Sequence, residues 1–275
     1  MLIAADMHVH IYPCYNAGLA LRSASNQLRQ LADEAVLAGR LPADEEVLSV
    51  LFLSERHDCS FFADLHAGHW KPEQSGFELS EVDDRHCILN DITGAGRLLP
   101  VAGRQIVSSE KLELTALGTD MRVADRSLSC KNLLRDIRSA GALPVLNWSP
   151  GKWTFRRRAL VKGLMQSERP GSLLFADTAL RPDCLWPEPL LKAASRAGFG
   201  VLCGSDPFPF AGEEGRIGRY ALGWQLEIQG RSIFEGVMNC ISHSDFSAVK
   251  CGTRLSPVGV LKLLCRLRFC THGRS

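Results

Sequence analysis

Two histidines near the start of the sequence, His8 and His10 in the segment DMHVH, have the spacing of a metal-chelating pair. Residues two apart in a β-strand point to the same side, so both imidazoles can face one ion while Val9 packs behind them. The apolar run that ends at Asp6 predicts a buried strand leading into the pair. We therefore predict a divalent metal site here, with a structural or solvent-facing pair as the alternative.

Three further residues have the chemistry of ligands or of proton carriers. Asp206 follows the apolar segment VLCGS and is expected to be a metal ligand or general base, unless it is an ordinary turn residue before Pro207. Asp177 ends the apolar segment SLLFAD and is a second candidate. His57, in the loop SERHD, can bind a metal or a leaving group, although a charged, solvated loop is the alternative.

Cationic side chains that can hold an anion follow later strands. We predict that Lys152, Arg181 and Arg219 bind a small anionic substrate, because guanidinium and ammonium groups match phosphate and carboxylate oxygens. The run from Arg156 to Arg158 is instead expected to be the solvated beginning of a helix.

The elements that must position these residues are apolar strands alternating with helices. Seven segments are expected to be strands: LIAAD (2–6), EVLSVLFLSE (46–55), RLLPVAGRQIV (97–107), LELTALG (112–118), LPVLN (143–147), SLLFAD (172–177) and VLCGSD (201–206). Because no glycine-rich phosphate turn follows the first strand, the pattern favours a (βα)7–8 barrel over an open doubly wound sheet. In a barrel the carboxyl ends of the strands share one face, which would gather the predicted site residues. We expect one domain, residues 1–275.

Charge and cysteine content limit the function classes. The 32 Lys and Arg nearly balance the 30 Asp and Glu, so no overall field favours nucleic acid or a membrane as partner. Ten cysteines without a CxxC pair fit reduced thiols, and the N-terminus resembles neither a signal peptide nor a membrane span, so we expect a cytoplasmic protein.

The segment SPVGVLKLLCRLRFC predicts a docked terminal helix, with a membrane-surface helix as the alternative.

Three motifs resemble those of the PHP family, the polymerase and histidinol phosphatase group of metal-dependent phosphoesterases within the amidohydrolase-like barrels. DMHVH at 6–10 is similar to that family's opening DxHxH, SERHD at 54–58 to its TDHD, and GSD at 204–206 to its GSDxH. Where the family has further ligands this sequence has Gln105, Thr115, the segment NWSPG at 147–151, and Phe208. The resemblance therefore implies a PHP-like barrel that holds one ion through His8, His10, His57 and Asp206, with Asp177 as a further candidate.

The implied reaction is hydrolysis. One Zn, Mn or Fe ion with an open coordination position can lower the pKa of a bound water to about 7 and create a hydroxide nucleophile. In this hypothesis Asp206 or Asp177 relays the proton and His57 binds the metal or the leaving group. The resemblance favours a small phosphate ester as substrate. An amidohydrolase-like C–N hydrolase and a noncatalytic descendant that binds a ligand or protein remain as alternatives.

Overall fold

The computed structural model describes residues 1–44, 46–94, 96–125, 127–184, 188–228, 230–244 and 246–272, with side chains of the last helix described through residue 268. Each of the seven segments expected to be strands is extended. The strands that they form are β1 (Leu2–Val9), β2 (Val47–Leu53), β5 (Arg97–Val101), β6 (Gly103–Val107), β7 (Glu113–Leu117), β8 (Leu143–Asn147), β9 (Leu174–Thr178) and β10 (Val201–Gly204). One expected strand is thus divided at Ala102 into β5 and β6.

Four further strands were not predicted. They are β3 (Phe77–Val82), β4 (Cys87–Asp91), β11 (Tyr220–Gln225) and β12 (Val249–Gly252). All four lie in antiparallel pairs, β3 with β4, β4 with β5, and β11 with both β1 and β12. Short antiparallel strands need no helical crossover, so the strand–helix rhythm used for the prediction does not detect them.

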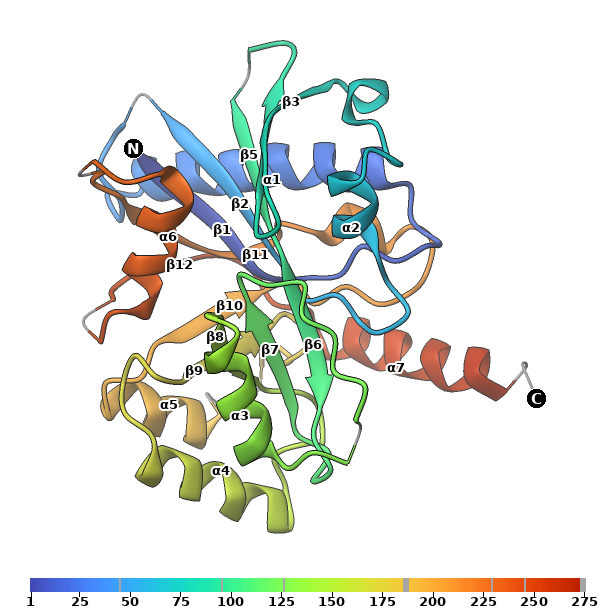
Figure 1. Cartoon of the computed structure of the whole chain (residues 1–275), viewed down its shortest axis with the longest axis vertical. Coiled ribbons are helices and arrows are strands. Elements are labelled where there is room, and N and C mark those ends of the chain that lie inside the picture. Colours follow the sequence, from blue (N-terminus) through green and yellow to red (C-terminus); the bar gives the residue numbers. More distant parts are fainter. Residues whose placement is uncertain are drawn as a thin grey trace.

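The prediction of a single barrel is wrong. In the described part of the chain the strands form two separate sheets, one of seven strands in the order β12-β11-β1-β2-β5-β4-β3 and one of five in the order β10-β9-β8-β7-β6. β11 pairs with the first half of β1, from Leu2 to Ala5, and so takes the edge that β10 would need in order to close a barrel. The fold is therefore a mixed α/β arrangement of two sheets (Figure 1).

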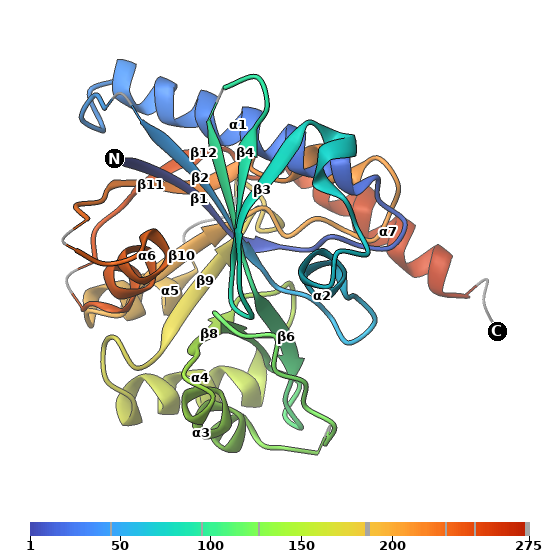
Figure 2. The same ribbon diagram turned by 45° about the horizontal axis from the view of Figure 1, so that its top comes forward.

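Helices cover the outer faces of the two sheets. α1 (Ala17–Leu37) lies across the seven-stranded sheet, and α3 (Cys130–Ser139), α4 (Phe155–Ser167) and α5 (Pro189–Arg196) lie along the five-stranded sheet (Figures 1 and 2). Alternation along β1 explains the layering. Leu2 and Ala4 pack toward α1, whereas Ile3, Ala5 and Met7 pack into the space between the sheets.

The remaining helices close the ends of the structure. α6 (Ile233–Ser242) inserts Phe234 and Met238 into the core between the sheets, close to Gly118 at the end of β7. α2 (Phe61–His66) follows β2, and α7 (Pro257–His272) ends the chain. Short 3-10 helices lie at Pro72–Ser75 and Glu213–Arg216. None of the helices in the described part of the chain combines the length and the apolar character needed to cross a bilayer.

Candidate metal centre

Three predicted ligands converge where β1 and β10 end. The Nε2 atoms of His8 and His10 lie 3.1 Å apart, and Asp206 Oδ1 lies 3.6 Å from the first and 3.4 Å from the second. Ligand atoms of the three residues all fall within 4.8 Å of one another, and no other group of three His, Cys, Asp or Glu side chains among the described residues does so. Both histidines are buried, with 4% and 2% of their surface exposed.

The donors around His8 Nε2 favour a cation at this point. This nitrogen faces His10 Nε2, Asp206 Oδ1 and, at 3.2 Å, Gln105 Oε1. A proton on His8 Nε2 can be donated to only one of these three atoms. A cation located between the lone pairs of these atoms would interact favourably with all of them. Two imidazoles and one carboxylate also form the ligand set of many catalytic zinc sites, which leave a position for water or substrate. The residues present therefore fit a divalent ion.

A close approach of β10 to β1 sets this geometry. A Cβ atom on Gly204 would lie only 2.4 Å from both the Cβ and the backbone nitrogen of His8, so only glycine fits at this crossing. Two residues later, the backbone N–H of Asp206 donates to the His8 carbonyl at 3.0 Å. Asp206 itself has φ 47°, a left-handed conformation that turns its side chain toward the histidines.

Asp6 stabilises the backbone around the candidate site but is not one of the three ligands. Its Oδ1 accepts from the backbone N–H groups of His8 at 3.2 Å and Ser205 at 2.9 Å, and its Oδ2 accepts from Gly218 at 2.8 Å. Burial raises the Asp6 pKa to about 6, although these hydrogen bonds act in the opposite direction. The aspartate before the histidine pair thus joins three chain segments that meet at the site.

Burial and nearby charges set the protonation of the ligands. Burial lowers the pKa of His8, which favours the neutral imidazole that binds metal, while Asp206, Glu113 and Asp6 act against this shift. Burial also acts to raise the pKa of Asp206, but the adjacent His8 and His10 and a hydrogen bond from Thr178 hold that pKa below its ordinary value. Both groups are therefore in their metal-binding forms near neutral pH.

Two further side chains orient the ligands. The Thr178 hydroxyl, at the end of β9, donates to Asp206 Oδ2 at 3.0 Å and leaves Oδ1 directed toward the histidines. Tyr12 stacks on the His10 ring with 5.2 Å between centroids, and the Arg56 guanidinium lies over the Tyr12 ring, 5.7 Å from its centroid. Sequence reasoning did not single out Thr178 or Tyr12, although Tyr12 continues the two-residue spacing of the histidines.

The positions where the resemblance implies additional ligands carry neutral groups that bond to one another. The Asn147 side chain donates to Thr115 Oγ1 at 2.8 Å, and Thr115 Oγ1 lies 3.3 Å from Ser54 Oγ. Both Thr115 and Asn147 are buried. Gln105 alone of this set contacts a histidine of the centre.

Lys152 is the predicted cation that lies on this side of the molecule. Its ammonium group is 3.3 Å from Glu113 Oε1, and Glu113 is close enough to His8 to influence the His8 pKa. Sequence reasoning missed Glu113 because it looked for polar residues at the carboxyl ends of strands. β7 runs antiparallel to β6 and β8, so its first residue, Glu113, pairs with the last residue of β8, Asn147.

The other predicted site residues lie apart from the three ligands. Asp177 forms a buried ion pair with Arg181 through both carboxylate oxygens, and one of these also accepts from the Tyr220 hydroxyl at 3.1 Å. Arg219 is exposed and donates to Gln27 on α1 at 2.9 Å. The His57 side chain is 67% exposed and lies outside the group of three; its Nδ1 is 4.0 Å from the carboxylate of its neighbour Asp58.

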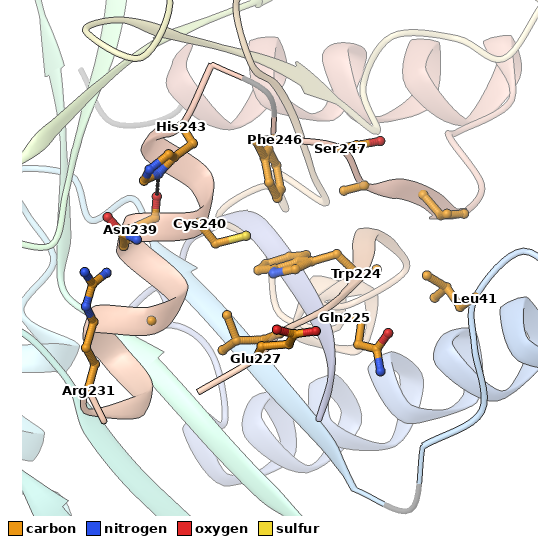
Figure 3. Close-up of a pocket in the computed structure, with 15 residues that line it drawn as sticks. Leu41, Trp224, Gln225, Glu227, Arg231, Asn239, Cys240, His243, Phe246 and Ser247 are labelled. Carbon is orange, nitrogen blue, oxygen red and sulfur yellow. Dashed lines mark hydrogen bonds between the residues drawn. The ribbon is translucent and has the colours of Figure 1, made fainter. Parts of the chain in front are cut away.

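A separate cleft lies between β11 and the ends of α6, lined by Trp224, Arg231 and His243 among others (Figure 3). This cleft is at the opposite end of β1 from the candidate metal centre, because Gln225 of β11 pairs with Leu2 at the beginning of that strand. It therefore cannot serve as the entrance to the three ligands.

Comparisons with known proteins give similarity at the level of structure alone. No family model and no curated protein matches the sequence. PsfC from Pseudomonas syringae matches over 100% of this chain and 99% of its own, with 14% identity and a TM-score of 0.49. A two-domain protein from Bacteroides vulgatus containing a predicted PHP-like metal-dependent phosphoesterase matches over 92% of this chain and 65% of its own, with 13% identity and a TM-score of 0.47. The lesion-specific endonuclease Q from Pyrococcus furiosus matches over 88% of this chain and 56% of its own, with 12% identity and a TM-score of 0.42. The chain thus spans less than two thirds of the last two proteins.

Proposed function

We propose that this protein is a metal-dependent hydrolase that cleaves a small phosphate ester with one divalent ion held by His8, His10 and Asp206. The observation that carries the proposal is the convergence of these three side chains within 4.8 Å, two of them buried imidazoles and one a carboxylate. Zn, Mn and Fe all accept this ligand set. A bound ion would supply a Lewis acid that lowers the pKa of water for attack.

In this proposal Asp206 and Thr178 have separate roles. Asp206 binds through Oδ1 while Thr178 fixes Oδ2 by its hydrogen bond of 3.0 Å. In the proposal Asp206 also accepts the proton of the attacking water. Asp177 takes no part, because its oxygens already accept from Arg181, Tyr220 and its own neighbour.

The positive charge of Lys152 beside the three ligands favours a phosphate ester over an amide as substrate. Lys152 lies on this side of the molecule, 32% exposed, and can turn from Glu113 to an incoming phosphoryl oxygen. A C–N hydrolase would use the same three ligands but would gain nothing from this cation. Replacing Lys152 should therefore lower activity toward a phosphate ester and leave an amide or cyclic imide unaffected.

The first test is metal content measured by elemental analysis on protein purified without added metal. We expect about one equivalent in the wild type and a loss in both His8→Ala/His10→Ala and Asp206→Asn, the second of which keeps the volume of the side chain. His69→Ala is the matched control, since His69 is 75% exposed. His57→Ala shows whether that loop histidine also binds the ion, as the sequence predicts.

The second test is turnover of generic phosphate monoesters, phosphodiesters and amides by the same variants, with circular dichroism to confirm folding. Hydrolysis of a phosphate ester that follows metal occupancy supports the proposal. If the wild type takes up no metal after reconstitution with Zn, Mn or Fe, the proposed mechanism is wrong and a ligand-binding role becomes the better explanation. If metal binds but only amides are cleaved, the C–N hydrolase is correct.

A further inference from the structure

The C-terminal helix α7 has two apolar faces, and the fold uses one of them. Leu263 and Leu267 pack with Phe208, Phe210 and Leu180 in a small separate core. In Figures 1 and 2 the helix lies along the side of the molecule, with its C-terminal end pointing away from the body. These contacts hold α7 against the body of the protein through its inner face.

The outer face of α7 is apolar and open to solvent. Val258 is 61% exposed, Leu261 62% and Leu264 37%, and Cys265 is exposed beside them. Their spacing of three, three and one residues places them on one side of the helix, with Val258 and Leu261 turned away from Leu263 and Leu267 and Leu264 at the border between the two faces. An isolated exposed leucine needs no explanation, but a continuous stripe on a terminal helix indicates a partner surface.

The charged side chains near the C-terminus are all basic. The last 30 residues, 246–275, contain no Asp or Glu and six Lys or Arg, whereas the chain as a whole is nearly balanced. Lys262 lies in α7 on one side of the apolar stripe, and Arg268 lies one turn after Leu264 at the C-terminal end of the same face. Arg266 is oriented by the body of the protein, with its guanidinium 4.3 Å from the Phe210 centroid. The natural partner is therefore both apolar and anionic.

We propose that α7 binds the surface of an anionic membrane, lying flat with Val258, Leu261 and Leu264 at the boundary between head groups and acyl chains. An exposed apolar face with basic side chains beside it and at its end fits the requirements of such interfacial helices. A second copy of the chain fits less well, because an isologous contact would bring the same basic residues together. Nucleic acid also fits less well, since phosphates need cations at the centre of the contact, where Leu261 and Leu264 lie.

This attachment would have a consequence for the candidate metal centre. The loop that follows Asp206 contains Phe208 and Phe210, and α7 packs directly on both. A membrane bound along the outer face of α7 would therefore lie near the side of the molecule that carries this loop. The inference itself does not depend on the proposed hydrolase activity.

The test is sedimentation of the full chain with vesicles at low ionic strength, comparing phosphatidylglycerol and phosphatidylcholine in equal parts with phosphatidylcholine alone. We expect binding to the anionic vesicles and little to the neutral ones. Leu261→Ser should weaken binding about tenfold because the leucine side chain inserts, and Lys262→Gln about fivefold because one surface cation is lost. Leu160→Ser and Arg156→Gln on α4 are matched exposed controls and should bind as the wild type does.

Four outcomes would overturn the proposal. The first is no binding to anionic vesicles by a folded wild-type chain. The second is a dimer in light scattering that Leu261→Ser converts to a monomer, which would make the outer face of α7 a contact between copies. The third is binding to a duplex oligonucleotide that Lys262→Gln weakens and Leu261→Ser does not. Equal losses in the α4 controls would also refute a specific role for α7.

Discussion

The hydrogen bond from Thr178 to Asp206 provides the sharpest test of how the candidate metal centre is organised. Thr178 is buried, with 3% of its surface exposed, and its hydroxyl donates to Asp206 Oδ2 at 3.0 Å. Thr178→Val keeps the shape of the side chain and removes this donor. A hydrogen bond to a charged group contributes roughly 1.5–3 kcal/mol, so the loss should weaken metal binding about 10- to 100-fold.

The measurement is a competition between the protein and a chromophoric chelator for Zn or Mn, with Thr178→Ser as the matched control. Serine keeps the hydroxyl, so its metal affinity should stay within a few-fold of the wild type. The same Thr178 oxygen accepts from the backbone N–H of Leu180 at 3.1 Å, so Thr178→Val should also lower the free energy of unfolding by roughly 1–2 kcal/mol.

Two results would refute this reasoning. If Thr178→Val binds metal as tightly as the wild type, Asp206 is not oriented through Oδ2 or is not a ligand. If Thr178→Ser loses as much affinity as Thr178→Val, the effect comes from packing at the end of β9, and the hydrogen bond has no special role. Either result is readable only when both variants remain folded, which circular dichroism checks.

Three further changes test other parts of the structure. Gly204→Ala places a Cβ within 2.4 Å of His8 and should abolish metal uptake and destabilise the fold by roughly 1–3 kcal/mol, as measured by elemental analysis and thermal unfolding. Burial raises the pKa of Glu55 from 4.5 to about 7, so the folded carboxyl holds its proton more tightly than the unfolded one. Glu55 should therefore contribute a fall in stability of roughly 3 kcal/mol as pH rises from about 4.5 through 7, and urea unfolding of Glu55→Gln should lack this contribution while keeping that of Asp6, whose pKa is also raised. Lys152→Met should raise KM for a phosphate ester about tenfold, whereas Arg219→Met, which lies beside α1, should leave it unchanged; the opposite pattern would place the substrate elsewhere.

Most of the fold elements could be predicted because their signals are local. An apolar run that ends in polar residues gave β1, β8, β9 and β10, and the expected alternation with helices is confirmed by α3, α4 and α5, which separate the strands from β7 to β10. Closure of the sheet is a long-range property, and it could not be predicted from these runs. The segment YALGWQ carries no sign that it pairs antiparallel with β1, yet this pairing decides that the sheets stay separate.

The candidate site shows the same division between local and long-range information. His8 and His10 were predictable from their two-residue spacing, and Asp206 from its place after a buried strand. Arg181 was predicted to bind substrate, but the structure pairs it with Asp177 across the turn that follows β9. Glu113 was missed because the direction of β7 is set by its pairing with β6 and β8.

The neutral polar groups around the three ligands support the part of the proposal that assigns a single ion to this site. Each additional ion would need anionic ligands to offset its charge, and the neighbouring positions supply an amide at Gln105, a hydroxyl at Thr115 and an amide at Asn147. The Asn147 amide donates to Thr115 Oγ1 at 2.8 Å, and Asn147 Oδ1 is buried without a partner, but as a neutral oxygen it adds no charge. Gln105 reaches His8, but as a neutral oxygen it adds no charge. The two imidazoles and the single Asp206 carboxylate thus match the three-ligand set of a single divalent ion with an open position, as the proposed hydrolase requires.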